Sequence, residues 1–110
     1  MNIVILGAGQ VGSELSAILA SDHDVTLIDL KQEKLQKISD HHDLKTICGN
    51  ACYPKTLEQA EIETADLAIA MTQYDEVNMV ACQMIKHMSK KTKTMARIRA
   101  TQYLGGNCLL

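Results

Sequence analysis

The chain has 110 residues, which is enough for one domain and leaves no room for a second of ordinary size. Hydrophobic residues make up 46% and charged residues 22%, the balance of a soluble globular protein, and the absence of Phe and Trp requires a core of aliphatic side chains. The net charge of −2 argues against a nucleic-acid binder with a basic face, and no apolar run reaches the roughly 20 residues that span a bilayer.

Apolar segments alternate along the chain between two kinds of spacing. Short runs rich in branched aliphatic residues, typical of strands buried on both faces, predict five strands at residues 3–6, 25–28, 44–48, 66–71 and 94–99. Helical spacing predicts helices at residues 11–19, 32–40, 53–62 and 75–89, the third opened by Tyr53-Pro54. We therefore expect βαβ units.

Strands that alternate with helices over short connections indicate a parallel sheet. The predicted fold class is α/β: a Rossmann-type, doubly wound sheet that forms a single domain over residues 1–110. Ligands of such folds bind beyond the carboxyl ends of the strands, where the strand order reverses.

The strongest motif joins the first strand to the first helix. It consists of Gly7, Ala8, Gly9, Gln10, Val11 and Gly12. A G-x-G-x-x-G pattern between a strand and a helix is the dinucleotide-binding fingerprint, because helix N–H groups hold the phosphates. Gly7 permits the tight turn, Gly9 leaves room for a pyrophosphate, and Gly12 lets helix and strand pack closely. The alternative is a glycine-rich turn that binds nothing.

Asp29 ends the second strand, where a dinucleotide fold places the acidic residue that binds the adenosine ribose. Its carboxylate would accept both ribose hydroxyls and repel a 2′-phosphate, which favours NAD(H) over NADP(H) and leaves ADP or ATP open. Leu30 and Lys31 follow at the same edge. Lys31 either approaches a 2′-phosphate or is a solvent-facing residue at a helix start.

Two later loops should reach the same edge. Gly49, Asn50 and Ala51 follow the third strand, where the Asn50 amide or the backbone would contact adenine. Met71 and Thr72 end the fourth strand, where the Thr72 hydroxyl either faces the ligand or caps the next turn.

Two arginines, Arg97 and Arg99, lie near the end of the fifth strand and would pair with phosphates, with carboxylates of this chain, or with a second subunit. Cys48 and Cys82 are interpreted as small buried hydrophobes, while Cys52 lies near the expected crevice. The cysteines, Cys108 included, lack zinc-site or C-x-x-C spacing and fit a reducing cytoplasm.

These motifs together resemble the N-terminal nucleotide-binding (RCK or KTN) domains of the TrkA proteins of bacterial Trk potassium uptake. The resemblance rests on residues 3–12, 49–51, 71–83 and 96–99, and the stretch from Met71 to Gln83 is its most distinctive part. It implies a non-catalytic regulatory subunit that binds NAD(H) or adenine nucleotides, forms homo-oligomers, and docks on the cytoplasmic face of a Trk-type potassium-translocating membrane protein. It further implies that Asn78 lies among the site residues, with Asp75 and Glu76 near the site or at a subunit contact.

Two departures from the family pattern affect these expectations. Relatives that favour ATP often carry Arg where this chain has Gln10, so a clamp on a γ-phosphate is not expected. The family domain continues beyond the fifth strand, whereas this chain ends with residues 103–110, which is interpreted as a truncation after that strand.

Two other functions fit parts of the sequence. The chain could be the cofactor half of an NAD-dependent oxidoreductase, although Tyr53, Tyr74 and Tyr103 have no Lys four residues on. It could also be an interaction domain with a vestigial nucleotide site.

Overall fold

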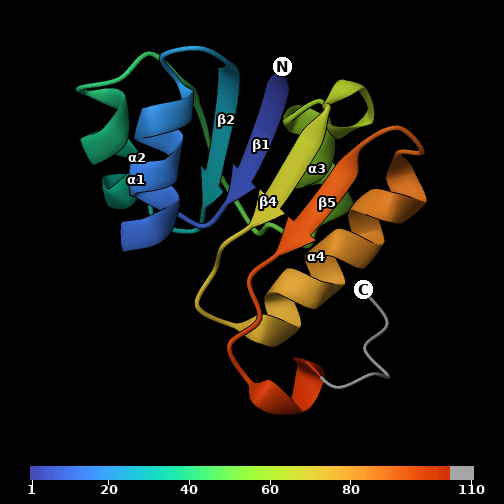
Figure 1. Ribbon diagram of the computed structural model, residues 1–110. Helices are drawn as coiled ribbons and strands as arrows, with labels where there is room; N and C mark the ends of the chain where they lie inside the picture. The colour runs from blue at the N-terminus through green and yellow to red at the C-terminus, as the bar shows by residue number, and fades with distance from the viewer. Residues whose placement is uncertain (105–110) are drawn as a thin grey trace.

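The computed structural model describes residues 1–104, so Cys108 and the tail at residues 105–110 lie outside the described part (Figure 1). The strands are β1 (Asn2–Leu6), β2 (Asp24–Asp29), β3 (Lys45–Cys48), β4 (Leu67–Ala70) and β5 (Lys93–Ala96). The helices are α1 (Gln10–Leu19), α2 (Gln32–Ser39), α3 (Pro54–Gln59) and α4 (Asp75–Met88), with 3-10 turns η1 (Ile62–Thr64) and η2 (Thr101–Leu104).

All five strands pair in parallel in one sheet with the order β3-β2-β1-β4-β5. The chain moves outward from β1 to β3 and then returns past β1 to β4 and β5. The strand order therefore reverses beside β1, between β1 and β4. This arrangement confirms the predicted α/β Rossmann-type fold and places the expected ligand crevice at the carboxyl end of β1.

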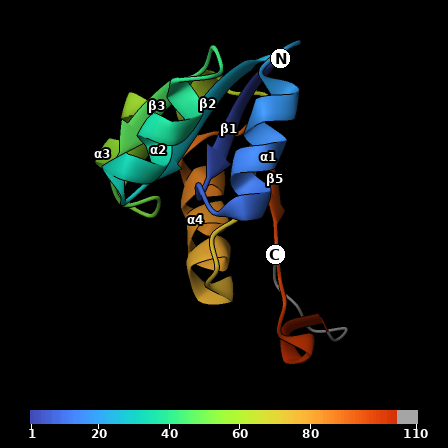
Figure 2. The ribbon, with the colours of Figure 1, turned by 90° about the vertical axis from the view of Figure 1, so that its left-hand side faces the viewer.

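Helices cover both faces of the sheet, so that the layers are helix, sheet and helix (Figure 2). Because side chains alternate along a strand, Ile3 and Ile5 of β1 pack toward α1 and α2, while Val4 and Leu6 pack toward α3, η1 and α4. Both core clusters are aliphatic, as the composition required. These two layers hold the carboxyl ends of β1, β2 and β4 at a common edge.

The structure departs from the sequence-based expectations in three places. Strand β5 ends at Ala96, so Arg97 and Arg99 follow the strand instead of lying on it. Ile62 belongs to η1 instead of the third helix. Cys48 is exposed because β3 is an edge strand, which makes its interpretation as a buried hydrophobe wrong, whereas Cys82 is buried as predicted.

The helices of residues 1–104 are all too short or too polar to cross a membrane.

Candidate nucleotide-binding site

The glycine-rich loop lies where the strand order reverses, and two of its glycines are required by close packing. Gly7 has a φ of 107°, and a Cβ there would lie 2.9 Å from both Met71 C and Thr72 N. A Cβ on Gly12 would overlap the carbonyl oxygen of Gly7. These two glycines therefore let α1 and the end of β4 pack against the loop.

Gly9 differs from both, because a Cβ at this position would have no atom within 4 Å in the described part of the chain. Its φ of −72° is also accessible to any residue. Nothing in the protein fold therefore explains a glycine here. The open space in front of its Cα is the room that a phosphate group needs to approach the backbone.

The amino end of α1 begins at Gln10, directly behind that space, with Gly9 as its N-cap residue. No side chain caps this end, and its first turn contains no acidic residue. The first-turn N–H groups of a helix have no partner within the helix, and the helix dipole is positive there. Gln10 and Val11 are both exposed at this end, so the anion-binding groups face solvent.

Asp29 is fixed against the loop by two backbone donors. Its Oδ2 accepts the N–H of Ala8 at 2.8 Å, and its Oδ1 accepts the N–H of Lys31 at 2.9 Å. A carboxylate offers about four acceptor positions, so two remain for further donors. The side chain is half-exposed, which leaves it within reach of a ligand.

Two residues flank Asp29 at the carboxyl edge of the sheet. Leu30 is 67% exposed, so its apolar side chain is accessible from solvent at this edge. Lys31 is exposed and is the N-cap residue of α2, as expected for a solvent-facing residue at a helix start.

The loop after β3 reaches the same edge, and its residues make contacts within the protein. A Cβ on Gly49 would lie 3.0 Å from Oγ1 of Thr56, so the glycine accommodates helix α3. Asn50 Oδ1 accepts the N–H of Cys52 at 2.8 Å and closes a local turn. Ala51 is buried in the core cluster that contains Leu57 of α3.

Four residues form a hydrogen-bonded cluster at the end of β4: Met71, Thr72, Asn78 and Arg97. Asn78 is 0% exposed, and its amide makes four hydrogen bonds: Oδ1 accepts the N–H and Oγ1–H of Thr72, and Nδ2 donates to the carbonyls of Thr72 and Arg97. Thr72 Oγ1 also bonds with Tyr74, so it caps the turn, the second of its two expected roles. The Asn78 amide is therefore fully bonded inside the protein, to the loop at the end of β4 and to the first residue after β5.

The Arg97 guanidinium turns toward the same loop. Its Nη2 donates to the carbonyl oxygens of Met71 and Thr72, at 3.2 and 3.0 Å. Its Nε is buried and has no hydrogen-bond partner among the described residues. Within residues 1–104, Arg97 forms no ion pair with a carboxylate, which was one of its three expected roles, and its Nε donor is unused.

The segment after β5 is held against the start of α4 by a carboxylate. Asp75 Oδ1 accepts the N–H of Arg99 at 2.9 Å, and Oδ2 accepts the N–H of Ala100 at 2.7 Å. These two hydrogen bonds lower the pKa of Asp75, and the bond from Arg99 has the larger effect. Further along, the Tyr103 hydroxyl donates to Glu76 at 2.8 Å, and this bond raises the pKa of Tyr103.

The internal bonding of Asn78 and Asp75 was not predicted, although the sequence contains a signal for Asn78. Asn78 lies at helical spacing with Ala81, Cys82 and Ile85, the buried stripe of α4. A polar side chain in an apolar stripe must find partners inside the protein. That rule indicates an internal role for Asn78 without a structure.

The remaining titratable candidates lie elsewhere or are tied to the protein. Cys52 Sγ is 3.6 Å from the carbonyl oxygen of Val77, and partial burial raises the pKa of its thiol. His41 and His42 follow α2 and His87 ends α4, so all three lie at the amino edge of the sheet, opposite the crevice.

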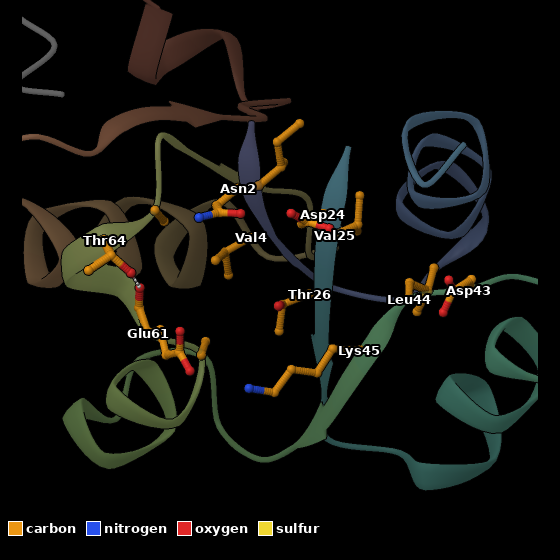
Figure 3. Close-up of a pocket in the computed structure, with 13 residues that line it drawn as sticks. Asn2, Val4, Asp24, Val25, Thr26, Asp43, Leu44, Lys45, Glu61 and Thr64 are labelled. Atoms are coloured by element: carbon orange, nitrogen blue, oxygen red, sulfur yellow. Dashed lines mark hydrogen bonds between the residues drawn. The ribbon is translucent and has the colours of Figure 1, made fainter. Parts of the chain in front are cut away.

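A hollow of about 430 Å³ also opens at that amino edge (Figure 3). Asp24, Thr26 and Lys45 line it, and Lys45 Nζ donates to the carbonyl oxygen of Gln59 at 3.3 Å. The predicted site residues do not line it. The glycine-rich loop lies at the other end of the strands, at the carboxyl edge of the sheet.

Comparison with known proteins agrees with this fold and motif. The TrkA-N domain family matches residues 3–105. A Trk system potassium uptake protein TrkA from Halomonas elongata is 44% identical over 105 residues, which cover 94% of this chain and 23% of that protein. The chain thus spans about a quarter of the length of this curated relative.

Two solved structures share the fold. The TrkA-N domain of the inner membrane protein ybaL from Escherichia coli aligns with a TM-score of 0.84 at 20% identity, over 92% of this chain and 75% of that one. The Shewanella denitrificans Kef CTD in its AMP-bound form aligns with a TM-score of 0.78 at 19% identity, over 94% and 65%. Together with the sequence match over residues 3–105, these similarities show that the chain belongs to the TrkA-N domain family.

Proposed function

We propose that this chain is the nucleotide-binding domain of a regulatory subunit of a Trk-type potassium uptake system. The observation that carries the proposal is the pairing of Gly9 with Asp29. Gly9 leaves open space before an uncapped helix end, and Asp29 presents a carboxylate fixed by backbone N–H groups beside it. A phosphate needs the first feature, and the hydroxyls of an adenosine ribose need the second.

The expected ligand is NAD(H), with ADP or ATP as the alternative. Asp29 would accept the 2′- and 3′-hydroxyls of the ribose through the acceptor positions that Ala8 and Lys31 leave unused. A 2′-phosphate would meet this carboxylate at close range, so NADP(H) should bind more weakly. Exposed Leu30 would pack on the adenine, and Arg97 Nε could reach a phosphate oxygen after a small movement.

The transport role rests on the relatives that carry the Trk system name. We propose that the domain lies at the inner face of the cell membrane, forms homo-oligomers, and contacts a Trk-type potassium-translocating protein. Regulation would be a population shift, in which two nucleotides with different contacts favour different subunit arrangements. In this account the domain catalyses no reaction and does not bind nucleic acid.

No observation favours the oxidoreductase alternative over this proposal. A dehydrogenase needs acid or base groups against the nicotinamide. His41, His42 and His87 lie at the far edge of the sheet. Turnover of NADH with a small carbonyl compound by this chain would revive that alternative.

The site is tested by substitution of Asp29 with a matched control. Asp29→Asn should weaken NADH binding by about 10-fold or more, because a charged acceptor of ribose hydroxyls is lost. Asp66→Asn is the control, because Asp66 Oδ2 also accepts a backbone N–H, that of Asn2 at 2.8 Å, but at the opposite edge. Isothermal titration calorimetry of both variants, each shown folded by circular dichroism, gives the comparison. Equal loss of affinity in both variants would contradict the ribose assignment.

The partner is tested separately. The chain should co-purify with a detergent-solubilised Trk-type potassium-translocating protein, and the amount bound should differ between NADH and NAD⁺. A chain that binds nucleotide but never the membrane protein would leave the site in place and refute the transport role.

A further inference from the structure

The crevice and the segment that leaves β5 meet at one buried side chain, that of Asn78. Its Nδ2 donates to the carbonyl oxygen of Thr72 at 3.1 Å and to that of Arg97 at 2.8 Å. One side of this bridge is the loop at the end of β4, and the other is the first residue after β5. Because Asn78 has no exposed surface, the bridge is shielded from water.

The loop end of the bridge touches the nucleotide-binding turn directly. Gly7 lies so close to Met71 and Thr72 that an added Cβ would be 2.9 Å from their backbone atoms. The N–H of Met71 also donates to the carbonyl oxygen of Leu6 at 2.7 Å. A ligand that shifts the turn by a fraction of an ångström must therefore move the loop as well.

The other end of the bridge leads into the segment that leaves the sheet. Shortly after Arg97, the N–H groups of Arg99 and Ala100 both donate to Asp75. Asp75 and Asn78 lie one turn apart at the start of α4, so one helix end holds the loop and the segment together. The segment then runs past the amino end of α4 and away from the sheet as η2 (Figure 1).

The cluster of Met71, Thr72, Asn78 and Arg97 contains a buried donor without a partner in the described chain, which favours a second arrangement of these residues. Arg97 Nε is buried without a hydrogen-bond partner among residues 1–104, so the present arrangement leaves one donor unused. Arg97 Nη2 donates to the carbonyl oxygens of Met71 and Thr72 in the same loop. A displacement of that loop changes the partners available to the guanidinium. An unsatisfied buried donor gains from any such change that brings an acceptor near.

We propose that Asn78 is a positioning residue that couples nucleotide binding to the segment at residues 97–104. The inference rests on the proposed function, because it concerns regulation of the same site. Nucleotide bound at the glycine-rich turn tightens the loop of Met71 and Thr72. Through Asn78, that loop then holds Arg97 and the following residues against α4.

Hydrogen exchange of the full 110-residue chain tests the coupling. Saturating NADH should slow exchange of the Arg99 and Ala100 amides by about 5-fold or more, the lower end of ordinary coupling between sites. Asn78→Asp keeps the shape but replaces the Nδ2 donor with an oxygen that repels the Arg97 carbonyl. This variant should still bind NADH, and its Arg99 and Ala100 amides should no longer respond.

A control and a milder variant separate coupling from loss of stability. Thr92→Val removes a buried hydroxyl that bonds with the carbonyls of Ile62 and Ala65 at the amino edge, and it should destabilise the chain while keeping the response. Thr72→Val removes one bond to Asn78 and should reduce the response even if Asn78→Asp does not fold.

The outcomes separate the two proposals. NADH and ATP that both fail to bind the wild-type chain would overturn the proposed function and this inference together. Binding without a change at Arg99 and Ala100 would overturn the inference alone. The same change in the Asn78 variant would also overturn it, because the bridge would then be dispensable.

Discussion

The most informative single substitution is Gly9→Ala, because it separates binding from folding. A Cβ at Gly9 would have no atom of residues 1–104 within 4 Å, and the φ of −72° suits alanine. Alanine is a poorer N-cap residue than glycine by a few tenths to about 1 kcal/mol. The lower entropy of the unfolded chain offsets this by about 0.4–1 kcal/mol. The free energy of unfolding should therefore change by less than about 0.5 kcal/mol.

Nucleotide binding should respond very differently. The added methyl group would occupy the space in which we place a phosphate, and such overpacking costs about 1–3 kcal/mol. That cost corresponds to a dissociation constant for NADH raised by about 5- to 150-fold. Gly7→Ala is the matched contrast: backbone strain at a φ of 107° and the contacts at 2.9 Å should destabilise the fold by about 2–6 kcal/mol.

Thermal unfolding followed by circular dichroism, with calorimetric titration of the same samples, measures both effects. The reasoning is refuted if Gly9→Ala binds NADH as tightly as the wild-type chain. It is also refuted if Gly9→Ala loses as much stability as Gly7→Ala, because the space at Gly9 would then not be open.

Three further predictions concern stability and thiol reactivity. Leu57 is fully buried in the core under β3 and β1, so Leu57→Ala should lower the free energy of unfolding by about 2–5 kcal/mol. Denaturant titration measures this loss, and a value below about 1 kcal/mol would contradict the core assignment. The pKa of Asp66 is lowered mainly by the N–H of Asn2, and that of Asp75 mainly by the N–H of Arg99, so both carboxylates stabilise the fold above their ordinary pKa of about 4. This stability should be lost as the pH falls below about 4, because the unfolded chain binds more protons there than the folded chain. The free energy of unfolding of Asp75→Asn should therefore depend less on pH in this range, as pH-jump unfolding would show. A pH profile equal to that of the wild-type chain would refute this prediction. Exposed Cys48 should react with a thiol reagent well before Cys82, whose pKa is raised by burial, and mass mapping that finds Cys82 first would contradict the burial.

The fold could be predicted from local sequence because each strand of this sheet carries its own signal. Ile3, Val4, Ile5 and Leu6 are all buried, and a run of branched residues between polar or glycine ends predicts such a strand. The role of Gly7 in a turn was equally visible, and the structure adds its left-handed φ. Boundaries set by local hydrophobicity fell within a few residues of those observed.

What could not be predicted depends on contacts between distant segments. Strand β5 stops at Ala96 because Asp75 binds the N–H groups of Arg99 and Ala100 and draws the chain away from the sheet. Arg99 and Ala100 lie 24 and 25 positions after Asp75 in the sequence, so no local pattern predicts these hydrogen bonds. Ala51 lies in the turn between β3 and α3, as expected, but only the packing of distant segments shows that this turn residue is part of the core.

The central claim is that this domain binds an adenine nucleotide through a ribose that carries a free 2′-hydroxyl. Calorimetric titration of the wild-type chain with NADH, NAD⁺, NADPH and ATP tests it most directly. The account predicts measurable binding of NADH or NAD⁺, with NADPH weaker by about 10-fold or more because its 2′-phosphate meets Asp29. NADPH that binds as tightly as NADH would contradict the role of Asp29. No binding of any of the four would contradict the nucleotide site itself.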